Sequence, residues 1–311
     1  MNRIALEGLI VAAHTPFTRD GDLALGAVET QAAHYLAHGL TTVFVAGSTG
    51  ESHSLSFEER RQLTTRWMEV IRGERMRVVV HVGSNCLVDA RALAAHAQAA
   101  GAAAIAALAP SYFRPQTADT LVDCCADIAA GAPELPFYFY DIPALTGVNL
   151  SMPEFLERGA ARIPTLSGIK WTNPDLCAYQ SCLHAPGKFD MPWGNDEYLL
   201  AALAVGARGA VGSSYAFAAR VYQRLLSAFA AGDMAGAQAE QYRSVQLIRL
   251  LAGYGYLGAA KAVMGMLGVD VGPARLPNGS LGAEQAARLR ADLEQLGFFE
   301  WIVPGAGERP C

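Results

Sequence analysis

The residue best suited to covalent chemistry in this chain is Lys170, because it lies in an apolar segment. Lysine occurs at only three positions, Lys170, Lys188 and Lys261. Lys170 belongs to the run Thr165-Leu-Ser-Gly-Ile-Lys-Trp-Thr172, which predicts a buried strand. Burial disfavours the charged form of an amine, and a neutral amine forms a Schiff base with a carbonyl substrate. The alternative is a core lysine whose charged end reaches water.

A strand rich in tyrosine and phenylalanine offers a group that exchanges protons. Segment 136–142 alternates Phe137, Tyr138, Phe139 and Tyr140. Because successive side chains of a strand point to opposite faces, the two phenols share one face. Tyr140 is nearer the end of the strand, where its hydroxyl can donate and accept a proton. Aromatic strands also occur in ordinary cores, so this pattern by itself leaves both interpretations open.

Polar residues and glycines follow several other predicted strands. Gly47-Ser-Thr-Gly-Glu51 places Ser48 and Thr49 between glycines, where free backbone N–H groups favour a small anion such as a carboxylate. An ordinary turn is the alternative. Gly194-Asn-Asp-Glu197 carries two carboxylates that suit the hydroxyls of a sugar-like chain, or that simply begin a helix.

These segments belong to a repeating order of apolar strands and helical stretches. Eight strands are predicted, over residues 8–15, 41–47, 77–83, 102–109, 136–142, 165–172, 189–194 and 209–213. Helices such as 56–72, 88–100 and 197–206 lie between them. Eight such units predict an α/β fold, a (β/α)8 TIM barrel, whose active site lies at the carboxyl ends of the strands.

The remainder of the chain is predicted to be helical. We expect a barrel core over 1–215, a C-terminal helical extension over 216–300 packed against it, and a frayed tail over 301–311. Ser56 with Glu59, and Ser151 with Glu154, have the spacing of capping boxes at two helix starts.

Composition excludes several classes of function. The net charge is −5 with no basic stripe, which argues against a nucleic-acid surface. The longest apolar runs are of strand length, so no membrane segment is predicted. The six cysteines include no CxxC pair and match no zinc pattern, which predicts reduced thiols, no metal site and a cytoplasmic protein.

Taken together, the motifs resemble a known family. Gly47-Ser-Thr-Gly-Glu51, Tyr140-Asp-Ile-Pro143, Gly168-Ile-Lys170, Gly194-Asn-Asp-Glu197 and Gly212-Ser213 occur in the order and spacing of the N-acetylneuraminate lyase and dihydrodipicolinate synthase family of pyruvate-dependent class I aldolases. The resemblance covers about residues 6–300. Segments 142–148, 163–169 and 272–277 look most similar to the N-acetylneuraminate lyase branch.

The resemblance implies a role for each matching residue. Lys170 would form a Schiff base with the 2-keto acid, Tyr140 would relay protons, and Ser48 and Thr49 would hold the pyruvate carboxylate. Tyr112 matches a tyrosine that joins this relay, often from a neighbouring subunit. The polyhydroxylated tail would be bound by Thr172, Gly194, Asp196, Glu197 and Ser213. No metal or organic cofactor is implied, and family members are commonly homotetramers.

The prediction of the substrate depends on an arginine that this sequence lacks. The synthase branch usually carries an arginine shortly after the tyrosine, whereas Tyr140 is followed here by Asp-Ile-Pro-Ala-Leu-Thr-Gly147. We therefore expect a lyase that cleaves a 2-keto sugar acid such as N-acetylneuraminate to pyruvate and N-acetylmannosamine. Dihydrodipicolinate synthase, which condenses pyruvate with aspartate semialdehyde, and a lyase or dehydratase for another 2-keto acid stay open. A barrel that binds pyruvate without catalysis is a third hypothesis.

Overall fold

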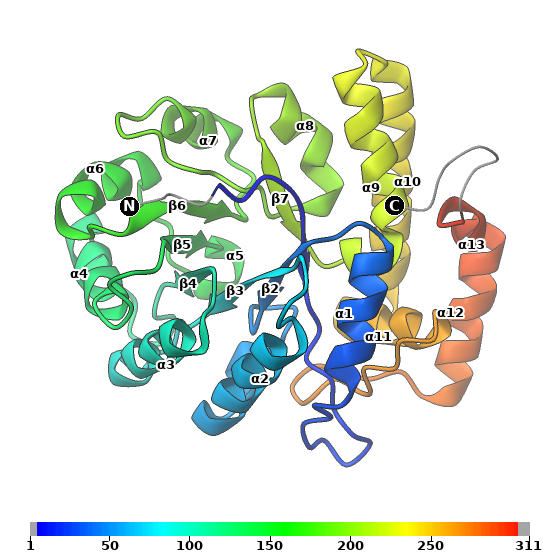
Figure 1. The fold of residues 1–311 in the computed structure, drawn as a ribbon. Helices are drawn as coiled ribbons and strands as arrows, with labels where there is room; N and C mark the ends of the chain where they lie inside the picture. Colours follow the sequence, from blue (N-terminus) through cyan, green and yellow to red (C-terminus); the bar gives the residue numbers. More distant parts are fainter. Residues whose placement is uncertain (1–4, 304–311) are drawn as a thin grey trace.

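The chain folds as a barrel of parallel strands surrounded by helices (Figure 1). The computed structural model describes residues 5–303. The strands are β1 (Gly8–Ala12), β2 (Thr42–Val45), β3 (Arg77–His81), β4 (Ala104–Leu108), β5 (Phe137–Asp141), β6 (Leu166–Trp171) and β7 (Gly209–Gly212). They pair in the order β6-β5-β4-β3-β2-β1-β7. The predicted α/β barrel class is confirmed.

Between the strands lie the helices that cover the outside of the barrel. These are α1 (Ala27–Ala37), α2 (Phe57–Val70), α3 (Leu87–Ala100), α4 (Ala118–Ala129), α5 (Pro143–Thr146), α6 (Met152–Arg162), α7 (Leu176–Leu183) and α8 (Leu199–Ala204), with short 3-10 turns η1 (Ser52–Ser54) and η2 (Asp196–Tyr198). The capping box of Ser56 and Glu59 at the start of α2 is confirmed. Ser151 caps α6, but the Glu154 side chain bonds to Arg158, one helical turn further along.

The seventh predicted strand, 189–194, is an irregular segment instead of a continuous strand. It forms isolated parallel bridges from Asp190 to Gly168, and from Trp193 to both Trp171 and Ala210. Pro192 in its middle has no N–H to donate, although its carbonyl accepts from Trp171 N–H at 2.8 Å. The segment therefore closes the barrel between β6 and β7 with fewer bonds than a regular strand provides.

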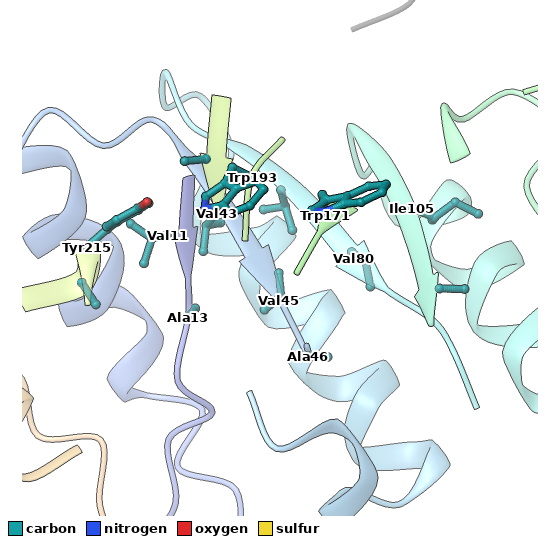
Figure 2. Packing of buried hydrophobic residues seen from close by; sticks show 14 of the residues in the cluster. Val11, Ala13, Val43, Val45, Ala46, Val80, Ile105, Trp171, Trp193 and Tyr215 are labelled. Atoms are coloured by element: carbon teal, nitrogen blue, oxygen red, sulfur yellow. The ribbon is translucent and has the colours of Figure 1, made fainter. Parts of the chain in front are cut away.

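The barrel has an inner and an outer apolar layer. Figure 2 shows residues of the outer layer, among them Trp171 and Trp193 and the valines of β1, β2 and β3. The inner cluster fills the barrel and consists of Leu6, Ile10, Ala12, Phe44, Val79, Ala104, Ala106, Leu108, Tyr138, Tyr140, Ile142 and Val211. Because Tyr138 and Tyr140 are in the inner layer and Phe137 and Phe139 in the outer one, the predicted alternation of β5 is confirmed.

Beyond β7 the chain is helical, as predicted. It forms α9 (Tyr215–Ala230), α10 (Met234–Gly253), α11 (Tyr256–Met266), α12 (Ala283–Leu296) and α13 (Phe298–Trp301). Helices α9 and α10 form a long pair beside the barrel (Figure 1). The expected tail over 301–311 begins inside α13, and residues 304–311 lie outside the described part of the chain. In residues 5–303, no helix combines the length and apolarity that crossing a bilayer requires.

Closure of the barrel at residues 189–194 requires a glycine at position 168. A Cβ atom there would lie 1.6 Å from the carbonyl oxygen of Asp190. We predict that Gly168→Ala lowers the free energy of unfolding by about 3 kcal/mol or more, since the backbone must move to admit the methyl group. Urea denaturation measures this change.

Gly265→Ala is the matched control, because a Cβ atom at this helical position would meet nothing within 4 Å. We expect it to stabilise the protein by at most about 1 kcal/mol. Equal effects of the two substitutions would contradict this account of the closure.

Candidate active site

The predicted site lies at the mouth of the barrel, where β2, β5 and β6 end. Lys170 is in β6 and its Cα is paired with that of Tyr140 in the neighbouring strand. Its side chain points inward and is only 4% exposed. The two-residue period of the strand therefore places the amine and the phenol in the same interior space, as the sequence predicted.

The environment of the Lys170 amine is aromatic. Nζ lies 3.6 Å from the centre of the Tyr140 ring and 4.4 Å from the centre of the Phe44 ring. No carboxylate in residues 5–303 is within ion-pair distance of this nitrogen. Aromatic faces attract a cation but, unlike a carboxylate, they do not hold it by a directed bond. The amine is thus buried and available to a reactant.

Lys261 shows the opposite arrangement of a buried lysine. Its Nζ lies 2.7 Å from a carboxylate oxygen of Glu51 and donates to the carbonyl of Pro273, also at 2.7 Å. Both side chains of this ion pair are almost fully buried. Lys188 is exposed. Of the three lysines, only Lys170 is both buried and free of a carboxylate partner.

Tyr140 lies between Lys170 and the glycine-rich loop that follows β2. Its oxygen is 3.2 Å from Ser48 Oγ, within hydrogen-bonding distance. The Phe44 and His81 rings each meet the Tyr140 ring at 5.9 Å, edge to face. The pair of hydroxyls forms a short path along which a proton can pass between the phenol and the loop.

The imidazole of His81 joins strand ends by hydrogen bonds instead of entering this relay, and in residues 5–303 neither ring nitrogen of His14 has a hydrogen-bond partner. His81 Nδ1 lies 2.9 Å from the Ala46 carbonyl, and Nε2 lies 3.3 Å from the N–H of Leu108. Burial lowers the pKa of His81 well below its ordinary value, and it lowers that of His14 to about 3. Both imidazoles are therefore neutral. His53 is exposed.

The loop that carries Ser48 and Thr49 is tightly constrained. Thr15 Oγ1 donates to the Gly50 carbonyl at 2.6 Å, and a Cβ at Gly47 would lie 2.7 Å from the Phe44 ring. Ser48 and Thr49 are half-buried and line a cavity of about 540 Å³. The other lining residues are Leu145, Gly255, Tyr256, Leu257, Gly258, Pro277, Asn278 and Gly279.

A second, smaller cavity brings together most of the residues predicted to bind the substrate tail. It measures about 200 Å³, and its lining consists of Gly194, Asn195, Asp196, Glu197, Ser213, Ile248 and Tyr256. Thr172 adjoins it through Gly194, because a Cβ at Gly194 would lie 1.9 Å from Thr172 Oγ1. That buried hydroxyl oxygen has no hydrogen-bond partner in residues 5–303.

Asp196 is a buried acid at the edge of this cavity. Its Oδ2 accepts from the N–H of Ser214 at 3.0 Å and from the Ser214 hydroxyl. Burial raises its pKa to about 7, although the Ser214 bonds oppose the rise. Gly212 makes room for this carboxyl, since a Cβ there would lie 2.2 Å from Oδ1. Asp196 changes its charge near neutral pH.

Tyr112 is not brought together with the other predicted residues. Its side chain is 79% exposed in the loop after β4, and its backbone N–H bonds to Asn85 at 3.1 Å. In residues 5–303 its ring contacts that of Phe113, which is itself 85% exposed. A role in the relay would need a second copy of the chain to bring Tyr112 to the barrel mouth.

Three features of the site were not predicted from the sequence. Phe44 lies against the amine, and the period of its strand could have indicated that it faces inward. Tyr256 borders both cavities, and Glu51 pairs with Lys261. Both contacts join residues far apart in the chain, so no local pattern indicates them. No group of three or more His, Cys, Asp or Glu side chains within residues 5–303 could hold a metal ion.

Comparison with known proteins gives a consistent result. The model of the dihydrodipicolinate synthetase family matches residues 5–296. N-acetylneuraminate lyase from Gallus gallus is 39% identical over 300 residues, which is 94% of this chain and 97% of the relative. The enzyme of that name from Rattus norvegicus is 37% identical over 302 residues, 95% of this chain and 94% of the relative.

The solved structures agree. Proteus mirabilis N-acetylneuraminate lyase has a TM-score of 0.92 at 38% identity, covering 95% of this chain and 100% of its own. N-acetylneuraminate lyase (sialic acid aldolase) from Aliivibrio salmonicida also has a TM-score of 0.92 at 38% identity. The match covers 95% of this chain and 98% of the solved chain. A dihydrodipicolinate synthase has a TM-score of 0.84 at 27% identity, and the match covers 94% of this chain and 99% of the solved chain.

The raised pKa of Asp196 predicts a titration near neutral pH. Below about pH 7 the carboxyl holds its proton, and above that pH it is ionised. In Ser214→Ala the hydroxyl that stabilises the carboxylate is lost, so we expect the pKa to rise further. Carbon-13 NMR of labelled aspartate measures both values. A lower pKa in the variant would contradict the assigned role of Ser214.

Proposed function

The chain belongs to the dihydrodipicolinate synthetase family, and from this premise we propose that it cleaves N-acetylneuraminate, or a closely related 2-keto sugar acid, to pyruvate and an aldehyde sugar. It is a class I pyruvate-dependent aldolase, a carbon–carbon lyase. The observation that supports its chemistry best is the Lys170 amine, buried without a carboxylate partner against the ring of Tyr140. For N-acetylneuraminate the aldehyde product is N-acetylmannosamine.

The reaction begins at the Lys170 amine. It adds to the keto carbon of the substrate, and loss of water leaves an iminium ion. The electrons of the bond between the third and fourth carbons then move into the iminium, which becomes an enamine. The hydroxyl on the fourth carbon loses its proton to the Tyr140 oxygen, while the phenol passes its own proton to Ser48 and Ser48 passes its proton to the substrate carboxylate that it holds, and the aldehyde forms. The same proton returns along this path to the enamine carbon. Protonation of the enamine and addition of water release pyruvate and the free lysine.

The two cavities supply the binding groups. Ser48 and Thr49 line the larger one and hold the carboxylate of the keto acid. Thr172, Gly194, Asp196, Glu197 and Ser213 bind the hydroxylated tail in and beside the smaller one. The iminium on Lys170 is the electron sink, so the proposed reaction uses no metal or organic cofactor.

The charge of the site disfavours the dihydrodipicolinate synthase alternative. The lining residues of both cavities include no lysine and no arginine. Asp196 and Glu197 border the smaller cavity and would repel the carboxylate of aspartate semialdehyde. Hydroxyl groups, in contrast, donate hydrogen bonds to these carboxylates.

We also propose a cytoplasmic homotetramer. Tyr112 and Phe113 expose large aromatic side chains on one loop, and a neighbouring subunit would cover them. Such a contact would bring the Tyr112 phenol to the relay of another subunit. Light scattering coupled to gel filtration measures the assembly, and a monomer at working concentration would count against it.

The first test traps the Schiff base. With pyruvate and borohydride, the protein is expected to gain a stable adduct on Lys170, which mass spectrometry of peptides locates. Lys170→Met should abolish the adduct, whereas Lys188→Met, the same change at an exposed lysine, should leave it intact. An adduct on another lysine, or none in the wild type, would overturn the proposed chemistry.

The second test separates the relay from the covalent step. Tyr140→Phe keeps the ring against Lys170 but removes the hydroxyl that meets Ser48. We expect kcat for pyruvate release to fall by about 10²- to 10⁴-fold, while pyruvate is still trapped on Lys170. Unchanged kcat would remove Tyr140 from the mechanism. Condensation with aspartate semialdehyde, measured beside cleavage of N-acetylneuraminate, distinguishes the two activities.

A further inference from the structure

Tyr256 is the contact between the C-terminal helices and the mouth of the barrel. It is the first residue of α11 and follows Gly255, whose φ of 83° starts the helix at this point. Its hydroxyl oxygen lies 2.7 Å from Ser213 Oγ, directly after β7. A side chain from outside the barrel thus bonds to one of the residues proposed to bind the substrate tail.

The same side chain borders both cavities. Tyr256 is the one residue that the two linings share. On one side lie Ser48 and Thr49, proposed to hold the carboxylate of the keto acid. On the other lie Asp196 and Glu197. A substrate that occupies both cavities would therefore lie against the Tyr256 side chain.

The chemistry of the phenol complements its neighbours. Burial and the nearby charge of Asp196 raise the pKa of Tyr256 far above its ordinary value, so the phenol keeps its proton. Tyr256 and Ser213 share one hydrogen between their oxygens, which leaves the pair a second O–H and unused lone pairs. Asp196 and Glu197 add acceptors. Donors and acceptors in one small space suit a polyol, because each of its hydroxyls both donates and accepts.

We propose that Tyr256 is a specificity-determining residue that binds a hydroxyl in the tail of the 2-keto acid and so selects substrates with an extended hydroxylated tail. This inference rests on the proposed lyase function. Tyr256 lies outside the Lys170–Tyr140–Ser48 relay, so it acts on the choice of substrate and not on the chemical step. A site that bonds to a substrate hydroxyl discriminates against an analogue that lacks it.

The experiment compares substrates that differ in the tail. Tyr256→Phe removes only the hydroxyl, and kcat and KM are measured for N-acetylneuraminate and for a 2-keto-3-deoxyhexonate, which lacks the glycerol side chain. We expect KM for N-acetylneuraminate to rise about tenfold, as for the loss of one hydrogen bond, and KM for the hexonate to stay unchanged. Equal changes for both substrates, or no change, would overturn the inference.

Tyr254→Phe is the matched control. Tyr254 lies two residues earlier and its hydroxyl donates to Asp292 at 2.5 Å, and it is not among the residues lining either cavity. This variant should cleave both substrates as the wild type does. Borohydride trapping of pyruvate should also be unaffected in both tyrosine variants, since neither touches Lys170.

A comparison in the synthetic direction separates failure of this inference from failure of the proposed function. Pyruvate is condensed with aldehydes ranging from glyceraldehyde to N-acetylmannosamine. If N-acetylneuraminate is not cleaved but Tyr256→Phe still lowers the preference for long aldehydes, the inference stands and the proposed substrate is wrong. If Tyr256→Phe leaves the preference for long aldehydes unchanged, the inference is wrong and the proposed function stands. If no aldehyde reacts, both are wrong.

Discussion

The site depends on a buried amine without a carboxylate partner. Transfer of an ammonium group from water into an apolar interior is costly, and proteins usually offset the cost with an opposite charge. Lys261 follows that rule through Glu51, whereas Lys170 lies against the rings of Phe44 and Tyr140. The absence of an ion pair leaves the Lys170 amine open to a carbonyl carbon. The strands, loops and glycines around it preserve that arrangement.

Small residues at strand ends keep the space that this chemistry needs. Gly194 lies where a side chain would collide with Thr172, and Gly212 lies where one would collide with the Asp196 carboxyl. Polar groups from three strand ends can therefore approach one another closely. The Asp190–Trp193 region, which closes the barrel through isolated bridges, places Gly194 and Asp196 beside β7. An irregular segment thus supports the part of the site that is proposed to bind the substrate tail.

The C-terminal helices take part in the site as well as in the fold. Two side chains of helix α11 reach the site. Lys261 forms an ion pair with Glu51, which ends the Ser48 loop, and Tyr256 forms a hydrogen bond with Ser213. The backbone N–H of Arg275 also donates to Glu51 at 2.8 Å. Residues that follow the barrel in sequence therefore hold both the loop of Ser48 and Thr49 and the wall of the smaller cavity. Removal of these helices would open the site on two sides.

Much of the fold and site could be predicted from the chain alone, because the relevant rules are local. The period of a strand placed Tyr138 and Tyr140 on one face, the apolar run predicted that Lys170 is buried, and the order of strands and helices predicted the barrel. The predicted regularity of 189–194 was wrong, since Pro192 and two different neighbouring strands determine its pairing. The reciprocal bond expected for Ser151 and Glu154 was also not found, because Arg158 takes the carboxylate.

The sequence by itself determined which residue types stand at the ends of the strands, and hence the class of chemistry. The tertiary structure alone decided which buried lysine is paired with a carboxylate, because Glu51 and Lys261 are separated by most of the chain. It also placed Tyr256 between the two cavities. Such contacts depend on how distant elements pack, and packing is set by the whole core instead of by the residues near each position in the sequence.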